Sequence, residues 1–127
     1  MAARHHRAGV AFVLGVLALT QAARGDGPEA APPRTIEVVA SRFKFTPAVI
    51  EVTEGERIQL KVRSSDGTHG IGIKDFQVKA RVPKTGETIT VEFVASKSGT
   101  FPVKCSEYCG GGHSGMKGQL IVHPKSQ

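Results

Sequence analysis

The chain has 127 residues, of which 39% are hydrophobic and 22% charged, and its formal net charge is +6. This length and balance are typical of one globular domain with a single modest core, and they exclude a second large domain. Its basic residues are spread along the chain and only 6% of residues are aromatic, so nucleic-acid binding is not expected.

The first 23 residues have the three-part layout of a secretory signal peptide. Arg4 and Arg7 make a basic start, residues 8–19 form an uncharged apolar run, and small residues follow. A membrane-spanning helix needs roughly 20 apolar residues, and this run is shorter. We therefore expect residues 1–23 to be a cleaved signal peptide that exports the protein to a periplasmic or other extracytoplasmic space. An uncleaved, short membrane anchor is the alternative.

A flexible linker is expected at residues 24–34, RGDGPEAAPPR, because this segment is rich in Gly, Pro and Ala. The folded domain is then expected to span residues 35–127. Within it, apolar and polar residues alternate over short runs bounded by turn residues, which predicts strands and no strong helix. These strands are expected at residues 35–39, 43–45, 49–52, 57–63, 71–78, 88–94, 100–105 and 118–123.

The clearest predicted strand is RIQLKVR at residues 57–63. Ile58, Leu60 and Val62 lie on one face of it, and polar or charged residues lie on the other. The segment at 71–78 is looser, because its apolar residues do not alternate strictly. About seven or eight short strands separated by turns are typical of an antiparallel β-sandwich.

Both cysteines of the chain lie in residues 105–116, CSEYCGGGHSGM. Two cysteines in an exported domain usually form a disulfide. A bridge between Cys105 and Cys109 would close a very short loop, so it would constrain the unfolded chain little. It would also leave the neighbouring His113 and Met116 without a role. A copper-free β-sandwich binding module with this disulfide remains one alternative.

Thiolate, imidazole and thioether groups together form a soft ligand set that favours copper over zinc. A mononuclear copper site for electron transfer uses one Cys, two His and a weak axial Met, so this sequence has one thiolate too many. Two thiolates can instead bridge two coppers, and each copper then needs one histidine. His69, in SSDGTHGIGI, is the candidate for the second histidine. His123, at the end of the last predicted strand, is expected on the surface.

These segments resemble a known family. CSEYCGGGHSGM is similar to the C-S-E-x-C-G-x-x-H-x-x-M motif of the CuA domain of cytochrome c oxidase subunit II, with every ligand position filled. DGTHGIGI resembles the upstream histidine segment of that family, and residues 42–66 resemble the opening of a cupredoxin. The resemblance covers most of residues 35–123. It implies a Greek-key cupredoxin β-sandwich or barrel.

The resemblance also implies a mixed-valence dinuclear copper centre. Two thiolates would bridge the ions, and each copper would gain one imidazole and one weaker ligand. The implied ligands are Cys105 and Cys109 as bridges, His69 with Met116 on one ion, and His113 with the backbone carbonyl of Glu107 on the other. Tyr108 is expected to pack over the site.

The chain departs from the subunit II pattern in three ways. A full subunit II carries membrane-spanning helices ahead of the copper domain, whereas this chain has only the predicted export segment. Gly70, Ile71 and Gly72 stand where the family has aromatic residues proposed to receive electrons. The domain is basic, whereas many family members attract a basic cytochrome c with acidic residues. These departures favour a free-standing exported electron carrier over a standard oxidase subunit.

The expected function is single-electron transfer between redox proteins of a respiratory chain, such as a cytochrome c or a terminal oxidase. Contact with a membrane is expected only through an uncleaved N-terminal segment or a partner complex. No serine–histidine–acid set or carboxylate pair predicts catalysis, so the chain itself is not expected to be an enzyme. The alternative is a protein that stores or delivers copper to an oxidase. Met1 and Met116 are the only methionines, so the chain lacks a Met-rich tract suited to delivery.

Overall fold

The computed structural model describes residues 30–126. The predicted signal peptide, residues 1–23, lies outside the described residues, as do residues 24–29 of the predicted linker. The described part holds nine strands and two short 3₁₀ turns. In chain order they are β1 (Arg34–Ser41), β2 (Lys44–Thr46), β3 (Val49–Thr53), β4 (Arg57–Ser64), β5 (His69–Ile73), η1 (Lys74–Phe76), β6 (Val78–Val82), β7 (Ile89–Val94), β8 (Gly99–Lys104), η2 (His113–Gly115) and β9 (Lys117–His123).

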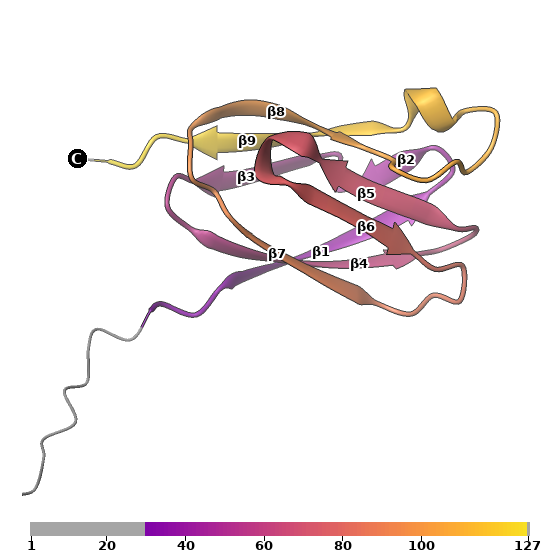
Figure 1. Cartoon of the computed structure of the whole chain (residues 1–127), viewed down its shortest axis with the longest axis horizontal. Coiled ribbons are helices and arrows are strands. Elements are labelled where there is room, and N and C mark those ends of the chain that lie inside the picture. Colours follow the sequence, from indigo (N-terminus) through magenta and orange to yellow (C-terminus); the bar gives the residue numbers. More distant parts are fainter. Residues whose placement is uncertain (1–29, 127) are drawn as a thin grey trace, which may run out of the picture.

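The strands form two packed sheets, so the predicted all-β sandwich is confirmed (Figure 1). One sheet has the order β2-β1-β4-β7, and the other has the order β3-β9-β8-β5-β6. Within residues 30–126, neither 3₁₀ turn has the length and apolar character needed to cross a membrane.

The sheets are mixed, whereas the sequence pattern predicted antiparallel pairing. β1 pairs with β4 in parallel, β3 pairs with β9 in parallel, and the other ladders are antiparallel. The alternation of side chains is the same in both kinds of strand. It therefore predicts strands without predicting the direction of their neighbours. No hairpin joins the parallel neighbours β1 and β4, because the chain passes through β3 of the other sheet before it reaches β4.

The core lies between the two sheets. Ile58, Leu60 and Val62 of β4 are fully buried, as the alternation in that strand predicts. Ile71 and Leu120 are fully buried in the facing sheet. Truncating a buried leucine such as Leu60 to alanine is expected to cost about 2–5 kcal/mol of stability. This core supplies the fixed frame for the loop between β8 and β9, residues 105–116, which contains predicted ligands and is called the metal loop below.

The loose strand predicted at residues 71–78 is a hairpin. β5 ends at Ile73, the turn η1 follows, and β6 begins at Val78. Gln77 makes the reversal with a φ of 56°, in the left-handed region. This conformation is usually adopted by Gly or Asn, so the sequence carries no ordinary turn signal at this position.

Candidate metal centre

The loop between β8 and β9 carries five of the six predicted ligands. Cys105 follows β8 directly, and Met116 directly precedes β9. The backbone N–H of Cys105 donates to the Met116 carbonyl over 3.2 Å, which closes the base of the loop. Cys109 and His113 lie in the loop itself. This loop lies at one end of the sandwich (Figure 1). The two strands therefore hold both ends of the loop in place.

Three sulfur atoms meet inside this loop. The Sγ atoms of Cys105 and Cys109 are 3.5 Å apart, and Cys109 Sγ is 3.8 Å from Met116 Sδ. Cys109 Sγ also lies 3.7 Å from Nδ1 of His113. All three sulfur-bearing side chains are buried. Both cysteines are free, so the structure does not contain the disulfide of the copper-free alternative.

His69 lies far from this loop in the sequence but close to its sulfur atoms in the structure. It opens β5 and has 0% exposed surface. One of its ring nitrogens and the Sγ atoms of Cys105 and Cys109 lie within 4.8 Å of one another. Nε2 is hydrogen-bonded to Oδ1 of Asp66, 2.6 Å away, whereas the buried Nδ1 has no hydrogen-bond partner. Because buried polar atoms are almost always satisfied, Nδ1 is the atom available to a metal.

Asp66 fixes the orientation of the His69 ring. Its carboxylate also accepts hydrogen bonds from the backbone N–H of Arg42, over 2.8 Å, and of Gly67, over 2.5 Å. Partial burial acts to raise the pKa of Asp66, but the hydrogen bonds from Arg42, His69 and Gly67 outweigh it and lower that pKa to about 2. The carboxylate is therefore charged at neutral pH. It holds the proton on Nε2 and leaves the lone pair on Nδ1, a common arrangement behind metal-bound histidines.

Two glycines let the loop approach its neighbours closely. A Cβ on Gly70 of β5 would lie 2.7 Å from the backbone nitrogen of Glu107, so the turn after Cys105 crosses directly over β5 at this glycine. A Cβ on Gly112 would lie 2.5 Å from Cγ of Phe43. Contacts below 3.0 Å do not occur for real Cβ atoms. Phe43, between β1 and β2, therefore packs directly against the glycine-rich loop at Gly112.

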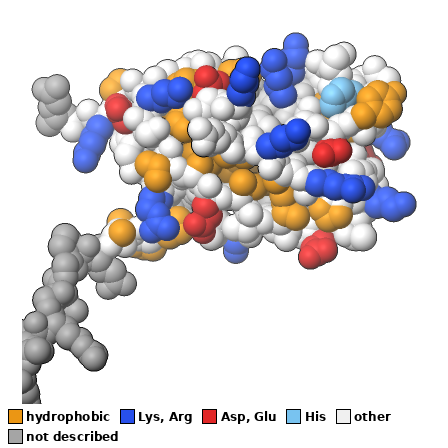
Figure 2. Space-filling view, in the orientation of Figure 1, with side chains coloured by type: hydrophobic (Ala, Val, Ile, Leu, Met, Phe, Trp, Pro, Cys, Tyr) orange, Lys and Arg blue, Asp and Glu red, His pale blue; other side chains and the backbone are white. Residues whose placement is uncertain are grey.

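Glu107 contributes its backbone to the cluster. The Cys105 thiol donates to the Glu107 carbonyl over 3.0 Å, so this oxygen faces the sulfur atoms. Tyr108 lies on the solvent side, with 77% of its surface exposed and its ring centroid 5.7 Å from that of His113. Figure 2 shows a pale-blue histidine beside a large orange side chain at this end of the molecule. His123 is exposed and lies 3.5 Å from Glu51, in keeping with the predicted surface position.

The Cys109 thiol holds its proton firmly. Burial and the neighbouring Cys105 raise the pKa of the Cys109 thiol to about 11. A metal bound by thiolates must displace the thiol protons, so metal uptake releases protons and is favoured by raised pH.

The structure brings five predicted ligand side chains and the Glu107 carbonyl toward one region, together with supporting residues that the sequence did not predict. Asp66, Gly70 and Phe43 were not predicted to have roles. Asp66 stands three residues before His69, a spacing that could have suggested a carboxylate partner. Phe43 lies far from the loop in sequence, and no local pattern reports its contact with Gly112.

The model of a family described as "Cupredoxin-like domain" matches residues 9–122. The chain belongs to the cupredoxin-like family. It is 34% identical over 88 residues to cytochrome c oxidase subunit 2 of Thermus thermophilus, covering 69% of this chain and 64% of that protein. A second subunit 2 sequence from the same species is also 34% identical, but only 52% of its length is covered. The chain thus spans less than two thirds of these curated relatives.

Solved structures confirm the predicted cupredoxin fold. The periplasmic domain of subunit II of cytochrome oxidase from Bradyrhizobium japonicum has a TM-score of 0.64 and 20% identity, covering 72% of this chain and 84% of that chain. Auracyanin A, a "blue" copper protein from Chloroflexus aurantiacus, has a TM-score of 0.57 and 17% identity, covering 72% and 100%. The similarity to subunit II is therefore found in the sequence, and the structural neighbours confirm the cupredoxin fold.

Proposed function

We propose that this domain carries a dinuclear copper centre of the CuA type and passes single electrons between redox proteins. The similarity to cytochrome c oxidase subunit 2 supports copper as the metal, and the cluster of His69, Cys105 and Cys109 supports this position for it. The observation that carries the proposal is the buried Nδ1 of His69, which has no hydrogen-bond partner and lies on the side of the ring away from Asp66.

The donor atoms fit two ions better than one. Two free thiols stand 3.5 Å apart, and histidine, methionine and carbonyl donors are arranged around them. We assign Cys105 and Cys109 as bridges. The remaining ligands are His69 and Met116 for one copper, and His113 and the Glu107 carbonyl for the other. Zinc does not account for the thioether of Met116, because zinc sites in proteins use S, N and O donors from Cys, His and carboxylates.

The residues of the chain suit electron transfer rather than substrate chemistry. A bound dinuclear centre would accept and return one electron, shared between the two ions. The sandwich and the contact of Phe43 with the loop would hold the ligands in one arrangement in both redox states, which would keep the reorganisation energy small. Met116 is 1% exposed and the cysteines are 7% and 8% exposed, so water is largely excluded from the sulfur ligands. Intrinsic catalysis is not part of the proposal.

The proposed setting is outside the cytoplasm. Residues 1–23 would export the chain, residues 24–34 would act as the linker and residues 35–127 would form the copper domain. The relative from Bradyrhizobium japonicum is described as a periplasmic domain, which supports a periplasmic location here. A cytochrome c or a terminal oxidase would be the redox partner. Contact with the membrane would then require an uncleaved N-terminal segment or a partner complex.

A spectroelectrochemical titration of the copper-loaded protein tests this function. An electron carrier takes up one electron per two coppers, releases it at the same potential and keeps its copper through repeated cycles. Copper should be measured after each cycle, with a Cu(I) chelator outside a dialysis membrane. Loss of Cu(I) to the chelator on reduction would contradict electron transfer and would support storage or delivery of copper.

A further inference from the structure

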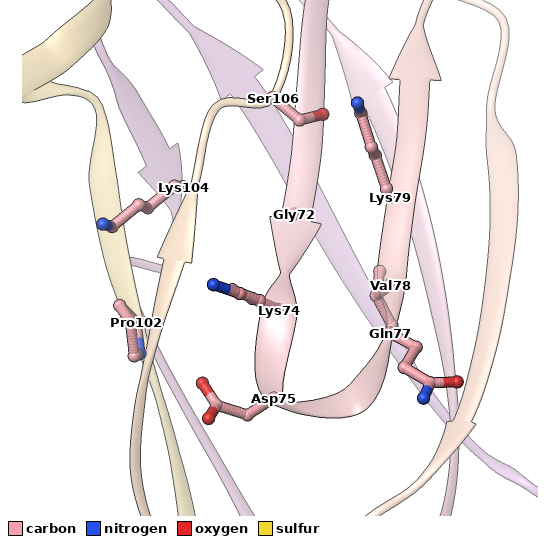
Figure 3. A pocket seen from close by; sticks show the side chains of 9 residues that line it. All are labelled: Gly72, Lys74, Asp75, Gln77, Val78, Lys79, Pro102, Lys104 and Ser106. Carbon is pink, nitrogen blue, oxygen red and sulfur yellow. The ribbon is translucent and has the colours of Figure 1, made fainter.

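A groove lies on the outer face of the five-stranded sheet, beside the metal loop (Figure 3). Its cavity volume is about 410 Å³. Gly72 of β5 lies at its centre, Pro102 of β8 and Val78 of β6 line its apolar sides, and Ser106 of the metal loop lies at one end. This groove is not part of the cluster of proposed ligands.

The register of the strands explains the groove. Gly72 stands opposite Lys79 of β6 and opposite Lys104 of β8, and Lys104 stands opposite Lys117 of β9. Residues directly opposite in neighbouring strands lie on the same face of a sheet. A row of three lysines therefore crosses the outer face, interrupted at Gly72. Because glycine has no side chain, the space between Lys79 and Lys104 stays open.

The strands also diverge at this point. The only paired residues of β5 and β8 are Gly72 and Lys104. Beyond this pair the two strands separate, which extends the groove toward Lys74 and Pro102. In Figure 3 the Lys74 side chain extends toward the β8 side of this opening. Space is thus available for a side chain from another molecule.

The charge around the groove is mostly positive. Lys74, Lys79 and Lys104 line it and are exposed, and Asp75 is the one acidic residue among its lining residues. No ion pair within residues 30–126 involves a lysine. Like charges this close repel one another, and an anionic group placed among them is attracted. The apolar floor with a cationic rim fits an acidic segment that also presents an apolar side chain.

The groove reaches the residue next to a proposed ligand. Ser106 lines the groove and is bonded through one peptide to Cys105, whose Sγ belongs to the cluster. A Cβ added at Gly72 would lie 3.4 Å from Cβ of Ser106, so Ser106 stands directly beside the floor of the groove. A molecule seated in the groove is therefore separated from the cluster by little more than the Cys105–Ser106 backbone.

We propose that this groove is the docking site for an acidic segment of the redox partner protein. The nature of the partner rests on the proposed electron-transfer function, whereas the recognition of an acidic segment rests on the groove alone. The concave shape favours an inserted protein side chain over the flat surface of an anionic membrane. The sign of the charge is opposite to that expected for a domain that receives electrons from a basic cytochrome c.

A titration of the ¹⁵N-labelled, metal-free full chain with the blocked peptide Glu-Glu-Leu-Glu-Glu tests recognition without depending on copper. Amide shifts should be largest at Gly72, Lys79 and Lys104. Reversing two charges, in Lys79→Glu/Lys104→Glu, should raise the dissociation constant of the peptide about tenfold, since two surface ion pairs with the peptide are replaced by repulsion. The matched control Lys61→Glu/Lys84→Glu, at exposed lysines outside the groove, should change the affinity less than twofold.

Shifts centred on Tyr108, or equal weakening in both double variants, would overturn the proposal. A chain that binds phosphatidylglycerol vesicles but not the peptide would also overturn the proposal, if Lys79→Glu/Lys104→Glu abolishes the binding to vesicles. In the copper-loaded protein, reduction by an acidic plant-type ferredoxin should be about tenfold slower in Lys79→Glu/Lys104→Glu, because of the same charge reversal. The rate should change little in Lys61→Glu/Lys84→Glu. Failure to load copper would refute the proposed function and leave the peptide result standing.

Discussion

The two histidines of the candidate centre lie in different surroundings. His69 opens a strand, is fully buried and is held through Nε2 by Asp66. His113 opens a short 3₁₀ turn in a loop, is half-buried and lies beside the exposed ring of Tyr108. The strand half of the site, which consists of His69 and its partner Asp66, therefore fixes the geometry of the ligands. The loop half, residues 105–116, brings the same cluster close to solvent.

The loop half contributes both cysteines, which lie close to His69 of the strand half, so their loss should have the largest effect. Cys109→Ser removes the sulfur that lies near Cys105, His113 and Met116 at once. We expect the dinuclear centre and its spectrum to be lost, which copper analysis and electron paramagnetic resonance would show. A variant with two coppers and an unchanged spectrum would refute the assignment of Cys109 as a bridge.

Replacing each histidine with glycine sharpens the comparison between the halves. In His113→Gly the half-buried position is accessible, so added imidazole should restore the copper spectrum. In His69→Gly the position is sealed by the core, and imidazole should restore little or nothing. Spectral titration of both variants with imidazole measures the difference. Equal rescue would show that the two halves are equally accessible, contrary to the structure.

A smaller effect is expected from Asp66, which acts only through His69. Asp66→Asn keeps the shape but loses the charge that holds the proton on Nε2. We expect copper affinity to fall by about tenfold, the lower end of the range for residues behind a metal ligand. Competition with a copper chelator measures this, and Asp75→Asn, an exposed carboxylate in η1, is the control. An unchanged affinity in Asp66→Asn would exclude the positioning role.

Met116 should tune the centre rather than hold it. Met116→Leu conserves volume in a position with 1% exposure, so the fold should persist. Both coppers should remain bound, while the reduction potential moves, because a weak thioether ligand adjusts the potential. Voltammetry checks the shift. Loss of all copper would contradict this role, and His123→Ala serves as the variant in which nothing at the metal should change.

The loop half of the site could be predicted from sequence, whereas the supports of the strand half could not. Cys105, Cys109, His113 and Met116 lie within twelve residues, so their spacing alone suggests a shared centre. His69 was predicted from the number of ligands required. Its contact with the cluster depends on β5 lying beside β8, a pairing of strands distant in sequence.

The fold was likewise predictable where local patterns report it and not where distant segments meet. Alternation predicted most strands, because it reports which face of each strand is buried. It did not predict the parallel pairs, or the reversal at Gln77, where a residue other than glycine adopts a positive φ. Phe43 and Gly112 show the same limit within the site. Their contact arises from the packing of the β1–β2 turn on the metal loop, and no local pattern in either segment encodes it.

The most direct test of the dinuclear centre is copper stoichiometry together with an electron paramagnetic resonance spectrum of the copper-loaded full chain. We predict two coppers per chain and hyperfine splitting from two equivalent nuclei. One copper per chain with a single-nucleus pattern would contradict the central claim and would leave one of the two cysteines outside the metal site.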